Sequence, residues 1–546
     1  MEKNKTEYGT AVLLSAATCL MFFLYAPLEL YFMNKDEFWY DIWVLFPVML
    51  CVFLMFTILC IAGFWVLRKR SEQLFCRSVL FLFILFLCSY VQGNYFINYL
   101  PVFDGRAIDW SQYAGVGRTQ SVILWCVVTG AVVFLYKKVQ IGRVYQVIRT
   151  VSICMILLFL VTLSTVCLTN HGLESKTNIC VTTEHEMELS TDQNFIILLM
   201  DALDGGAFSD MVVGNEERES IFDDFTYYDN TVSAYPHTTY NVPFILSGMW
   251  FENQTGRDAY FRKVLTESPL FETLENRGYA LGLYEVDAGV DETTGARFEN
   301  VGEYTKKVSS YTAFARWQIM LTGLKYAPFD LKRFSFVNPN AFDDLRVLEG
   351  EGEAFRDNNN RDFYDLLTQE TIQYRDDKSF KFIHLWGAHP PYEYDKDLNY
   401  LPEGGTLTQS VEACLTLSDL YLQKLKDGDV YDNSVIIILA DHGNGEYYEE
   451  DNLNQHPVLL IKGVNERHGF QVDHRPVSFT ALQAACSHLL DGGDGQTAFD
   501  GQTLTENRRF LWYDIKDDTH IVEYEQTGRA GDMNTTVPTG REFNAR

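Results

Sequence analysis

Two acidic positions follow directly after long apolar runs in the second half of the sequence. Asp201 comes after NFIILLM, and the pair Asp441-His442 comes after SVIIILA. In parallel α/β sheets, ligands collect just beyond the carboxyl ends of buried strands, and carboxylates with one imidazole suit Mn²⁺, Mg²⁺ or Zn²⁺. A single aspartate after a strand is often only a helix cap or a turn residue. Two such positions, one of them Asp-His-Gly, favour a metal site.

Two further segments carry groups that could act on a phosphoryl ester. The stretch 235–248 reads YPHTTYNVPFILSG, in which hydroxyl side chains precede an apolar helix start. A hydroxyl at a helix N-terminus lies where backbone N–H groups favour anions, so it could be a nucleophile, and an ordinary threonine N-cap explains the pattern equally well. In the stretch 384–392, HLWGAHPPY, His389 could donate to a phosphoryl oxygen or could have a structural role alone.

A sheet covered by helices is expected to position these segments. From Gln193 onward, short apolar runs alternate with longer amphipathic stretches, which predicts an α/β domain with a mostly parallel central sheet. The polar stretch 174–192 predicts a stalk, and the tail after residue 515 is strand-like at 520–524. The expected strands are 194–200, 279–285, 380–386, 434–440, 458–462 and 509–513, and the expected helices are 268–277, 407–426 and 477–490.

Five apolar stretches dominate the first 170 residues, at 10–32, 43–67, 78–100, 121–136 and 151–168. Most of them reach the ~20 residues that cross the hydrocarbon core as a helix, and the first is too long for the apolar core of a signal peptide. Basic residues concentrate in alternate connections, at Lys3 and Lys5, at 68–77 and at 137–149. Because basic loops tend to stay cytoplasmic, an odd number of spans places the remaining chain outside.

Aromatic residues gather at the predicted outer ends of these spans. They predict an interfacial aromatic belt or, alternatively, outer loops that help to hold a lipid substrate. These aromatic residues are Trp39, Tyr40, Trp43, Trp110 and Tyr113.

The charge differs sharply between the two parts of the chain. Residues 1–170 hold 13 Lys+Arg and 9 Asp+Glu, which leaves 31 and 64 for residues 171–546, a net charge of −33. The negative charge of residues 171–546 repels phosphates, so nucleic acid is excluded as a partner. Eight of the 11 cysteines precede residue 170, which argues against a disulfide-rich scaffold and leaves open one bridge among Cys180, Cys414 and Cys486.

Taken in order, these segments resemble the alkaline phosphatase and sulfatase superfamily, and within it the lipoteichoic acid synthase type of phosphoglycerol transferase. The resemblance runs from about Gln193 to Tyr513 and rests on four stretches. Five spans followed by an external catalytic domain is also the layout of those synthases. The four stretches are NFIILLMDAL, HTTYNVPFILSG, HLWGAHPPYEY and SVEACLTLSDLYLQKLKDGDVYDNSVIIILADHG.

The resemblance implies a role for each matching residue. Asp201, Asp441 and His442 become metal ligands, Thr238 becomes the nucleophile and a further ligand, and His389 contacts the phosphoryl oxygens. Thr238 is preferred to Thr239 because the superfamily nucleophile stands five residues before the helix proline, here Pro243, and ten before the glycine, here Gly248. His456 lies where some relatives place another active-site histidine, and it is left outside this set.

Three departures from the superfamily patterns narrow the range of enzyme classes that fit the sequence. The synthases usually carry Glu at the first ligand position, where this chain has Asp201 as sulfatases do. Sulfatases need Cys or Ser followed by x-Pro-x-Arg, whereas Thr238 is followed by TYNV. Two-zinc phosphodiesterases would show Asp four residues before His389, where Leu385 stands. A phosphotransferase with one divalent ion, preferably Mn²⁺ with Mg²⁺ or Zn²⁺ as alternatives, is the remaining fit.

The sequence thus predicts a five-span transmembrane bundle at 1–170, a stalk at 171–192, an external sulfatase-like α/β catalytic domain at 193–515 and an extension at 516–546. The expected enzyme of the plasma membrane moves phosphoglycerol from phosphatidylglycerol to a surface glycan or polymer through a phospho-threonine intermediate. Its partners are a phospholipid donor, that acceptor and the bilayer. A phosphoethanolamine transferase, a sulfatase-like ester hydrolase and a non-enzymatic membrane scaffold stay open as alternatives.

Overall fold

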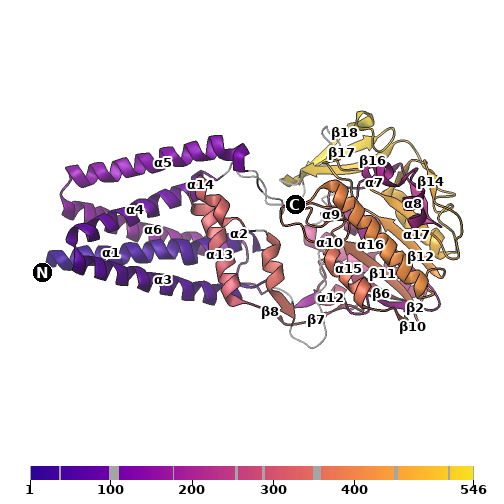
Figure 1. Ribbon diagram of the computed structural model, residues 1–546, viewed down its shortest axis with the longest axis horizontal. Coiled ribbons are helices and arrows are strands. Elements are labelled where there is room, and N and C mark those ends of the chain that lie inside the picture. Colours follow the sequence, from indigo (N-terminus) through magenta and orange to yellow (C-terminus); the bar gives the residue numbers. More distant parts are fainter. Residues whose placement is uncertain are drawn as a thin grey trace. The chain divides into compact units, whose positions relative to one another are not determined.

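A computed structural model describes residues 2–35, 38–97, 108, 110–175, 178–251, 256–285, 289–337, 339–348, 358–447, 453–514 and 517–544. The chain forms two compact units. The first contains Met1–Thr177 and Lys306–Val347, and the second contains Asn178–Thr305 and Leu348–Arg546 (Figure 1).

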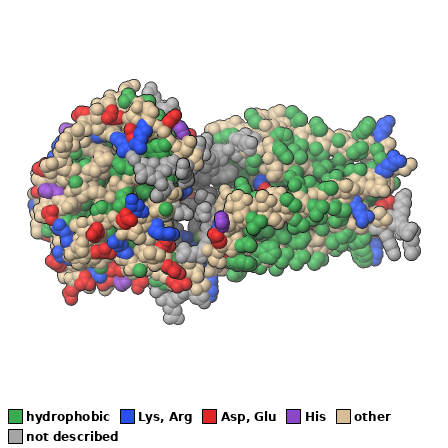
Figure 2. Space-filling view, turned by 180° about the vertical axis from the view of Figure 1, so that it is seen from behind, with side chains coloured by type: hydrophobic (Ala, Val, Ile, Leu, Met, Phe, Trp, Pro, Cys, Tyr) green, Lys and Arg blue, Asp and Glu red, His purple; other side chains and the backbone are tan. Residues whose placement is uncertain are grey.

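The first unit contains five helices that are long and apolar enough to cross a membrane, at Thr6–Met33, Ile42–Arg70, Glu72–Tyr95, Trp110–Lys138 and Ile141–Thr169. The first span is built from α1 (Glu2–Leu20), a π-helical turn (Met21–Tyr25) and α2 (Ala26–Met33), and the others are α3 to α6. Helices of 24 to 29 residues exceed the ~20 residues that a bilayer core requires. Apolar side chains cover most of the helical surface in Figure 2. The five predicted spans are confirmed.

The basic connections of the bundle lie at one end. Arg68, at the end of α3, lies over the rings of Tyr8 and Phe75, at 5.4 and 5.7 Å, so the start of the first span and the connection after the second are neighbours. The side chains of Lys3 and Lys5, which contribute to the predicted orientation, lie outside the described residues.

A segment of the predicted catalytic range belongs to the first unit instead. Lys306–Val347 groups with the membrane helices and contains α13 (Tyr311–Tyr326), the single turn α14 (Phe329–Lys332) and 3₁₀ turns at Arg333–Ser335 and Pro339–Leu345. Its ends meet in the two-stranded sheet of β8 (Lys306–Val308) and β9 (Arg346–Leu348). The predicted range 193–515 therefore holds an insertion, because buried side chains of this segment pack on the helices of the first unit.

The second unit is built on a seven-stranded sheet of order β14-β4-β13-β12-β3-β11-β6. All neighbouring pairs except the two that involve β13 are parallel, so the sheet is mostly parallel, as predicted. The predicted strands are found within two residues at each end. The seven strands of this sheet are β3 (Asn194–Met200), β4 (Thr226–Tyr228), β6 (Tyr279–Tyr284), β11 (Lys378–Leu385), β12 (Ser434–Leu439), β13 (Leu459–Lys462) and β14 (Gln471–Asp473).

Helices cover both faces of this sheet. On one face, α9 (Thr238–Ser247), α11 (Pro269–Asn276) and α17 (Leu482–Leu490) pack in one apolar core, and on the other α7 (Gly205–Val212), α15 (Asn360–Gln369) and α16 (Leu407–Asp427) pack in a second. The central strand β3 alternates between them, since Phe195, Ile197 and Leu199 join the first core and Ile196 and Leu198 the second. A strand buried on both faces explains the unbroken apolar run in its sequence.

The smaller elements include α8 (Glu216–Glu219), α10 (Arg257–Glu267) and α12 (Glu292–Gly295), and the two-residue strands β5 (Thr231–Val232) and β15 (Val477–Ser478), which pair with each other. The predicted helix 477–490 begins with β15 and a 3₁₀ turn, so only its second part is helical.

Two segments predicted as peripheral take part in the second unit. Within the predicted stalk, β1 (Ile179–Val181) pairs with β7 (Val301–Glu303), and β2 (Glu188–Ser190) pairs with β10 (Gln373–Arg375). After the sheet, β16 (Arg508–Asp514), β17 (Asp517–Gln526) and β18 (Thr536–Asn544) form one three-stranded sheet. The predicted boundary at 515 and 516 lies outside the described residues.

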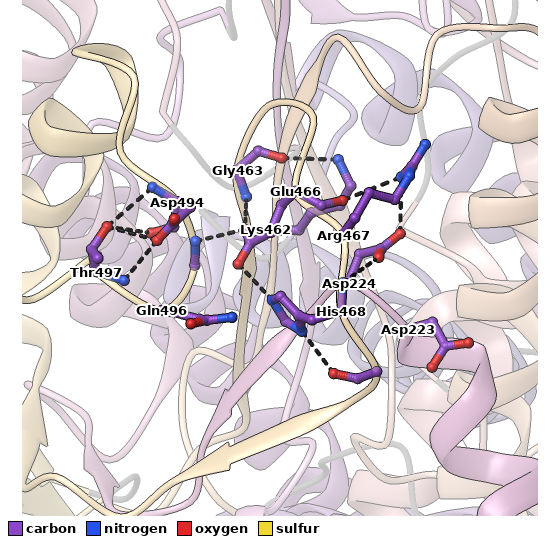
Figure 3. Close-up of polar contacts among 12 residues, drawn as sticks. Asp223, Asp224, Lys462, Gly463, Glu466, Arg467, His468, Asp494, Gln496 and Thr497 are labelled. Carbon is purple, nitrogen blue, oxygen red and sulfur yellow. Dashed lines mark hydrogen bonds and ion pairs between the residues drawn. The ribbon is translucent and has the colours of Figure 1, made fainter.

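Charged side chains are buried at the end of β13, at the sheet edge where β3 and β12 begin. Both carboxylate oxygens of Glu466 are used: Oε2 accepts from the backbone N–H groups of Gly463 and Gly495 at 2.5 and 2.7 Å, and Oε1 lies 2.7 Å from His468 Nε2 (Figure 3). Lys462 Nζ donates to three backbone carbonyls at 2.9 to 3.1 Å. We call this group the Glu466 cluster.

Candidate active site

Four adjacent parallel strands end at the candidate site, and three of them carry predicted site residues just beyond their carboxyl ends. In the order β12, β3, β11 and β6, these strands end just before Asp441, Asp201, Trp386 and Glu285. The register aligns Leu439 with Leu199 and Leu385 with Met200, so the strands finish at the same level. Parallel pairing therefore brings together residues that lie about 240 positions apart, such as Asp201 and Asp441.

Asp201, Asp441 and His442 form a buried cluster whose ligand atoms all lie within 4.8 Å of one another. His442 Nε2 is 3.5 Å from Asp201 Oδ1 and 3.5 Å from Asp441 Oδ2. The other ring nitrogen, Nδ1, lies 2.7 Å from the carbonyl oxygen of Gly443, and a carbonyl can only accept. The proton therefore sits on Nδ1, which leaves Nε2 as a ligand atom facing the carboxylates.

Thr238 is the first residue of α9 and is not its N-cap. The N-cap residue is His237, which makes no side-chain capping bond. Thr238 Oγ1 donates to Asp201 Oδ2 at 3.3 Å and lies 3.5 Å from His442 Nε2. Its hydroxyl therefore lies beside the ligand cluster, at the end of the helix where backbone N–H groups favour an anion.

Three polar side chains brace the loops that carry these groups. Asp204 Oδ1 caps α7 through the N–H groups of Gly206 and Ala207, and its Oδ2 accepts from Asn444 N at 3.1 Å. Asn444 Nδ2 in turn donates to the carbonyl of Ala388 at 3.1 Å, in the His389 loop. Asn241 of α9 donates to the backbone carbonyl of Asp441. The α9 helix and three strand-end loops are thereby held together.

The backbone at Asp201 is unusually crowded. Ala202 adopts a left-handed conformation with φ 54°, and its N–H donates to Asp441 Oδ1 at 3.2 Å. Gly387 has φ 58°, and a Cβ added there would lie 2.5 Å from Asp201 N. A non-glycine residue in the left-handed conformation raises the free energy of the folded protein by on the order of 1 kcal/mol or more, and such residues concentrate at functional sites.

His384 and Glu285 form a buried pair next to Asp201 that sequence reasoning did not assign. His384 Nδ1 contacts Glu285 Oε2, and His384 Nε2 lies 3.6 Å from Asp201 Oδ2. Glu285 follows β6 just as Asp201 follows β3, so an acidic residue after a buried strand was again the available signal. Burial lowers the pKa of His384, but Glu285 and Asp201 outweigh it and raise that pKa well above its usual value. A proton on this ring would stabilise the negative charge of Asp201.

His389 lies near the cluster without contacting it directly. Its ring centre is 6.5 Å from that of His442 and 4.8 Å from that of Trp386. Its Nδ1 is buried and has no hydrogen-bond partner among the described residues. His456 Nε2 instead lies 3.1 Å from the carbonyl oxygen of Asp229, and this ring does not belong to the ligand cluster found in the described part of the chain.

The two carboxyl groups respond differently to this environment. Burial raises the pKa of Asp201, but the nearby His389, His384 and His442 more than compensate and hold it below the usual range. Burial and the Asp201 carboxylate together raise the pKa of Asp441. Burial lowers the pKa of His442, yet Asp441 and Asp201 outweigh burial and raise it. Groups that share one small space and compete for protons are typical of functional sites.

The cluster fits a divalent cation. Asp201 Oδ1 and Asp441 Oδ2 are buried and have no hydrogen-bond partner among the described residues. Buried polar atoms are nearly always satisfied in native proteins, and a cation between two carboxylates and one imidazole would satisfy both oxygens. Asp201, Asp441, His442 and the Thr238 hydroxyl are the groups that would hold it.

No known protein family and no curated protein matches the sequence. Among solved structures, the chain is similar to a protein of the alkaline phosphatase superfamily from Vibrio parahaemolyticus, with 15% identity and a TM-score of 0.35 over 67% of this chain and 84% of that one. A putative sulfatase from Bacteroides fragilis gives 12% identity and a TM-score of 0.34 over 68% and 90%. The C-terminal periplasmic domain of EcEptC from Escherichia coli gives 12% and 0.31 over 64% and 92%.

One of these neighbours is named as a member of the alkaline phosphatase superfamily and one as a putative sulfatase, as the motifs predicted, and none of the three is named as a lipoteichoic acid synthase. With TM-scores of 0.31 to 0.35, they carry no argument about substrate or reaction.

Proposed function

We propose that the protein is a metal-dependent phosphotransferase of the cell membrane that moves phosphoglycerol from phosphatidylglycerol to a surface glycan or polymer. One observation carries the proposal: the Thr238 hydroxyl, at the start of α9, lies 3.3 Å from Asp201 and 3.5 Å from His442 within the ligand cluster. A hydroxyl in that position combines a nucleophile, an anion-binding helix end and a cation site.

Each residue then has a defined task. A bound divalent ion supplies Lewis-acid chemistry, which lowers the hydroxyl pKa and offsets phosphoryl charge. Thr238 provides the nucleophilic oxygen, the first N–H groups of α9 face the phosphoryl group, and His389 donates to one of its oxygens. The His384–Glu285 pair keeps Asp201 ionised.

The transfer proceeds in two balanced halves. Thr238 Oγ1 loses its proton and bonds to phosphorus, the phosphorus–oxygen bond to diacylglycerol breaks, and the diacylglycerol oxygen takes up a proton. The acceptor hydroxyl then loses its proton and bonds to the same phosphorus, while the bond to Thr238 breaks and its oxygen is reprotonated. One ester is exchanged for another, so no nucleotide is needed.

The local charge explains why a cation is required. The donor is an anionic phosphodiester, and residues 171–546 carry a net charge of −33. Without a cation between Asp201 and Asp441, the substrate would be repelled by both carboxylates.

Headgroup-labelled phosphatidylglycerol tests the proposal on the full-length protein in vesicles that contain Mn²⁺. We expect diacylglycerol to be released and the label to become bound to a peptide that contains Thr238. A label that never becomes protein-bound would contradict the covalent step. If phosphatidylethanolamine alone is consumed, the covalent chemistry is supported but phosphatidylglycerol is the wrong donor. Turnover of soluble phosphate or sulfate esters without any lipid would favour a hydrolase.

A further inference from the structure

The insertion Lys306–Val347 is basic in an acidic half of the chain. It holds seven Lys and Arg against three Asp, whereas all of 171–546 holds 31 against 64. It is also the part of that half that groups with the membrane helices. An excess of four positive charges in a segment that belongs to the membrane unit calls for a physical reason.

The insertion is docked on the ends of the spans away from the basic connections. Trp39 Nε1 donates to the carbonyl of Phe342 at 2.6 Å, and the buried Tyr40 accepts from Gln318 at 2.5 Å. Both aromatic residues just precede α3, so they serve as a docking surface for the insertion and not only as an interfacial belt. A Cβ on Gly93, near the end of α4, would lie 2.5 Å from the Tyr326 ring.

Polar contacts anchor the insertion deeper in the bundle. Lys325 Nζ lies 2.5 Å from Glu29 Oε2 of α2, with both side chains mostly buried. Phe329 N donates to Ser121 Oγ of α5 at 3.0 Å. Ionisable residues within membrane spans are rare and usually pair with one another. The Lys325–Glu29 and Phe329–Ser121 contacts therefore fix the insertion on α2 and α5.

The remaining surface of the insertion combines exposed aromatic or apolar residues with cations. Arg316 lies over the Trp317 ring at 5.0 Å, and Arg333 lies over the Phe334 ring at 4.7 Å. Phe334 is 67% exposed and Leu331 is 53% exposed. Asp330, which directly precedes Leu331, is paired with Arg118 at 2.8 Å, so its charge is already balanced. We call Arg316, Trp317, Leu331, Arg333 and Phe334 the headgroup face.

We propose that the headgroup face binds the anionic headgroups of phospholipids at the membrane surface. Aromatic rings and arginines at the level where spans end are suited to the headgroup layer, where rings enter the interface and cations meet phosphate. Each cation close to an anionic surface contributes roughly fivefold in local enrichment, the equivalent of ~1 kcal/mol. The insertion would raise the local concentration of anionic lipid at the end of the spans where it docks.

This inference does not depend on the chemistry at Thr238. A nucleic acid is disfavoured because the rest of 171–546 is strongly acidic. A protein partner is a distinct outcome of the test, since it would be captured in place of lipid.

A photoreactive benzoylphenylalanine at Phe334 tests the proposal in the full-length Thr238→Ala protein, which leaves the lipid unconsumed. The protein is reconstituted in vesicles of phosphatidylcholine with or without phosphatidylglycerol. The matched control carries the same residue at Tyr374, which is 59% exposed in the second unit. We expect lipid adducts at position 334, enriched in phosphatidylglycerol over its share of the vesicle, and few at position 374.

Charge variants separate anionic recognition from simple proximity to lipid. The double variant Arg316→Gln with Arg333→Gln should lower the phosphatidylglycerol enrichment by roughly an order of magnitude and leave adducts with phosphatidylcholine in place. The control pair Lys263→Gln with Lys396→Gln changes two exposed cations of the second unit and should leave the enrichment unchanged. Equal lipid adducts at 334 and 374, adducts to protein alone, or enrichment that survives loss of both arginines would each overturn the proposal.

Discussion

The central sheet of the second unit buries charged groups at both of its edges, and the two edges differ in how those groups are satisfied. At the carboxyl edge, Asp201 Oδ1 and Asp441 Oδ2 have no hydrogen-bond partner among the described residues. At the opposite edge, both oxygens of Glu466 accept hydrogen bonds (Figure 3), and Lys462 donates to three carbonyls. Burial of charge alone therefore does not mark a functional site. Two unpartnered carboxylate oxygens whose side chains share one small cluster with an imidazole do mark such a site, because a single cation would satisfy them together.

The largest effect on turnover is expected at Thr238, the proposed nucleophile. Thr238→Ala should lower diacylglycerol release from phosphatidylglycerol by on the order of 10⁴-fold or more, because no other group forms the covalent bond. At saturating Mn²⁺ the variant should still bind metal, because the two carboxylates and the imidazole of Asp201, Asp441 and His442 remain and the neutral Thr238 hydroxyl is the weakest of the four ligands. The unfolding midpoint should change little, because only one weak hydrogen bond to Asp201 is lost. Release of labelled diacylglycerol measures the loss.

The neighbouring hydroxyl is the matched control for this substitution. Thr239→Ala should retain measurable turnover, since Thr238 is the threonine with contacts to Asp201 and His442. If Thr239→Ala were the inactive variant and Thr238→Ala retained activity, the nucleophile would be wrongly assigned.

Metal binding should depend on one edge of the sheet alone. Asp441→Ala or His442→Ala should weaken Mn²⁺ binding more than roughly 100-fold, since the loss of a direct ligand exceeds the 10- to 100-fold effect of second-layer partners. Glu466→Ala removes a buried carboxylate of similar burial at the other edge and should leave the metal content of the folded protein unchanged. Elemental analysis of the purified full-length proteins measures the difference. Equal metal loss in both kinds of variant would break the distinction between the edges.

The sequence was sufficient to predict this edge because its signals are local. Unbroken apolar runs predicted β3 and β12 within one residue at each end, and parallel pairing then required Asp201 and Asp441 to meet. Thr238 and His389 were located through motif spacing, and the structure places Thr238 within the cluster and His389 near it. The role of each in catalysis stays a prediction.

The His384–Glu285 contact and the insertion could not be predicted from local sequence signals. His384 lies inside a quoted motif, but its contact with Glu285 depends on the register of β11 and β6, which sequence alone does not give. The insertion was missed because its packing is non-local: Gln318 contacts Tyr40 across 278 positions of sequence. Its local charge reversal was the available signal, and it was hidden by averaging over the whole external half.

Stability should respond in opposite directions at the two edges in the absence of metal. Glu466→Gln leaves an amide against two N–H donors and should destabilise the protein by about 1–3 kcal/mol. Asp441→Asn removes a charge whose ionised form is disfavoured by burial and by Asp201, so it should raise the unfolding midpoint. Thermal unfolding of the full-length protein in detergent with a chelator measures both. Destabilisation by Asp441→Asn would show that this carboxylate is structural.

The pH dependence of metal binding should distinguish the same two edges. The pKa values of Asp441 and His442 are both raised in the folded protein, so in the metal-free site these groups keep protons that free side chains would lose. Metal ligands bind in deprotonated form, so a cation must displace those protons. Mn²⁺ affinity should therefore fall as the pH is lowered from roughly 8 to 5, by up to about tenfold per pH unit for each proton displaced. Calorimetry in two buffers of different ionisation enthalpy counts the protons released.

The same pKa shifts of Asp441 and His442 determine whether stability rises or falls with pH. A group whose pKa is raised on folding contributes stability that is present below its unfolded pKa and is lost as the pH rises through its folded pKa. Asp441 and His442 therefore make the metal-free protein less stable as the pH rises, whereas saturating Mn²⁺, which binds better at higher pH, should reverse the trend. The Glu466 cluster is fully hydrogen-bonded without a cation, so Asp441→Asn should remove the Mn²⁺-dependent part of the profile and Glu466→Gln should retain it. A Mn²⁺ affinity that does not change with pH would mean that the cation binds without displacing protons from these two residues.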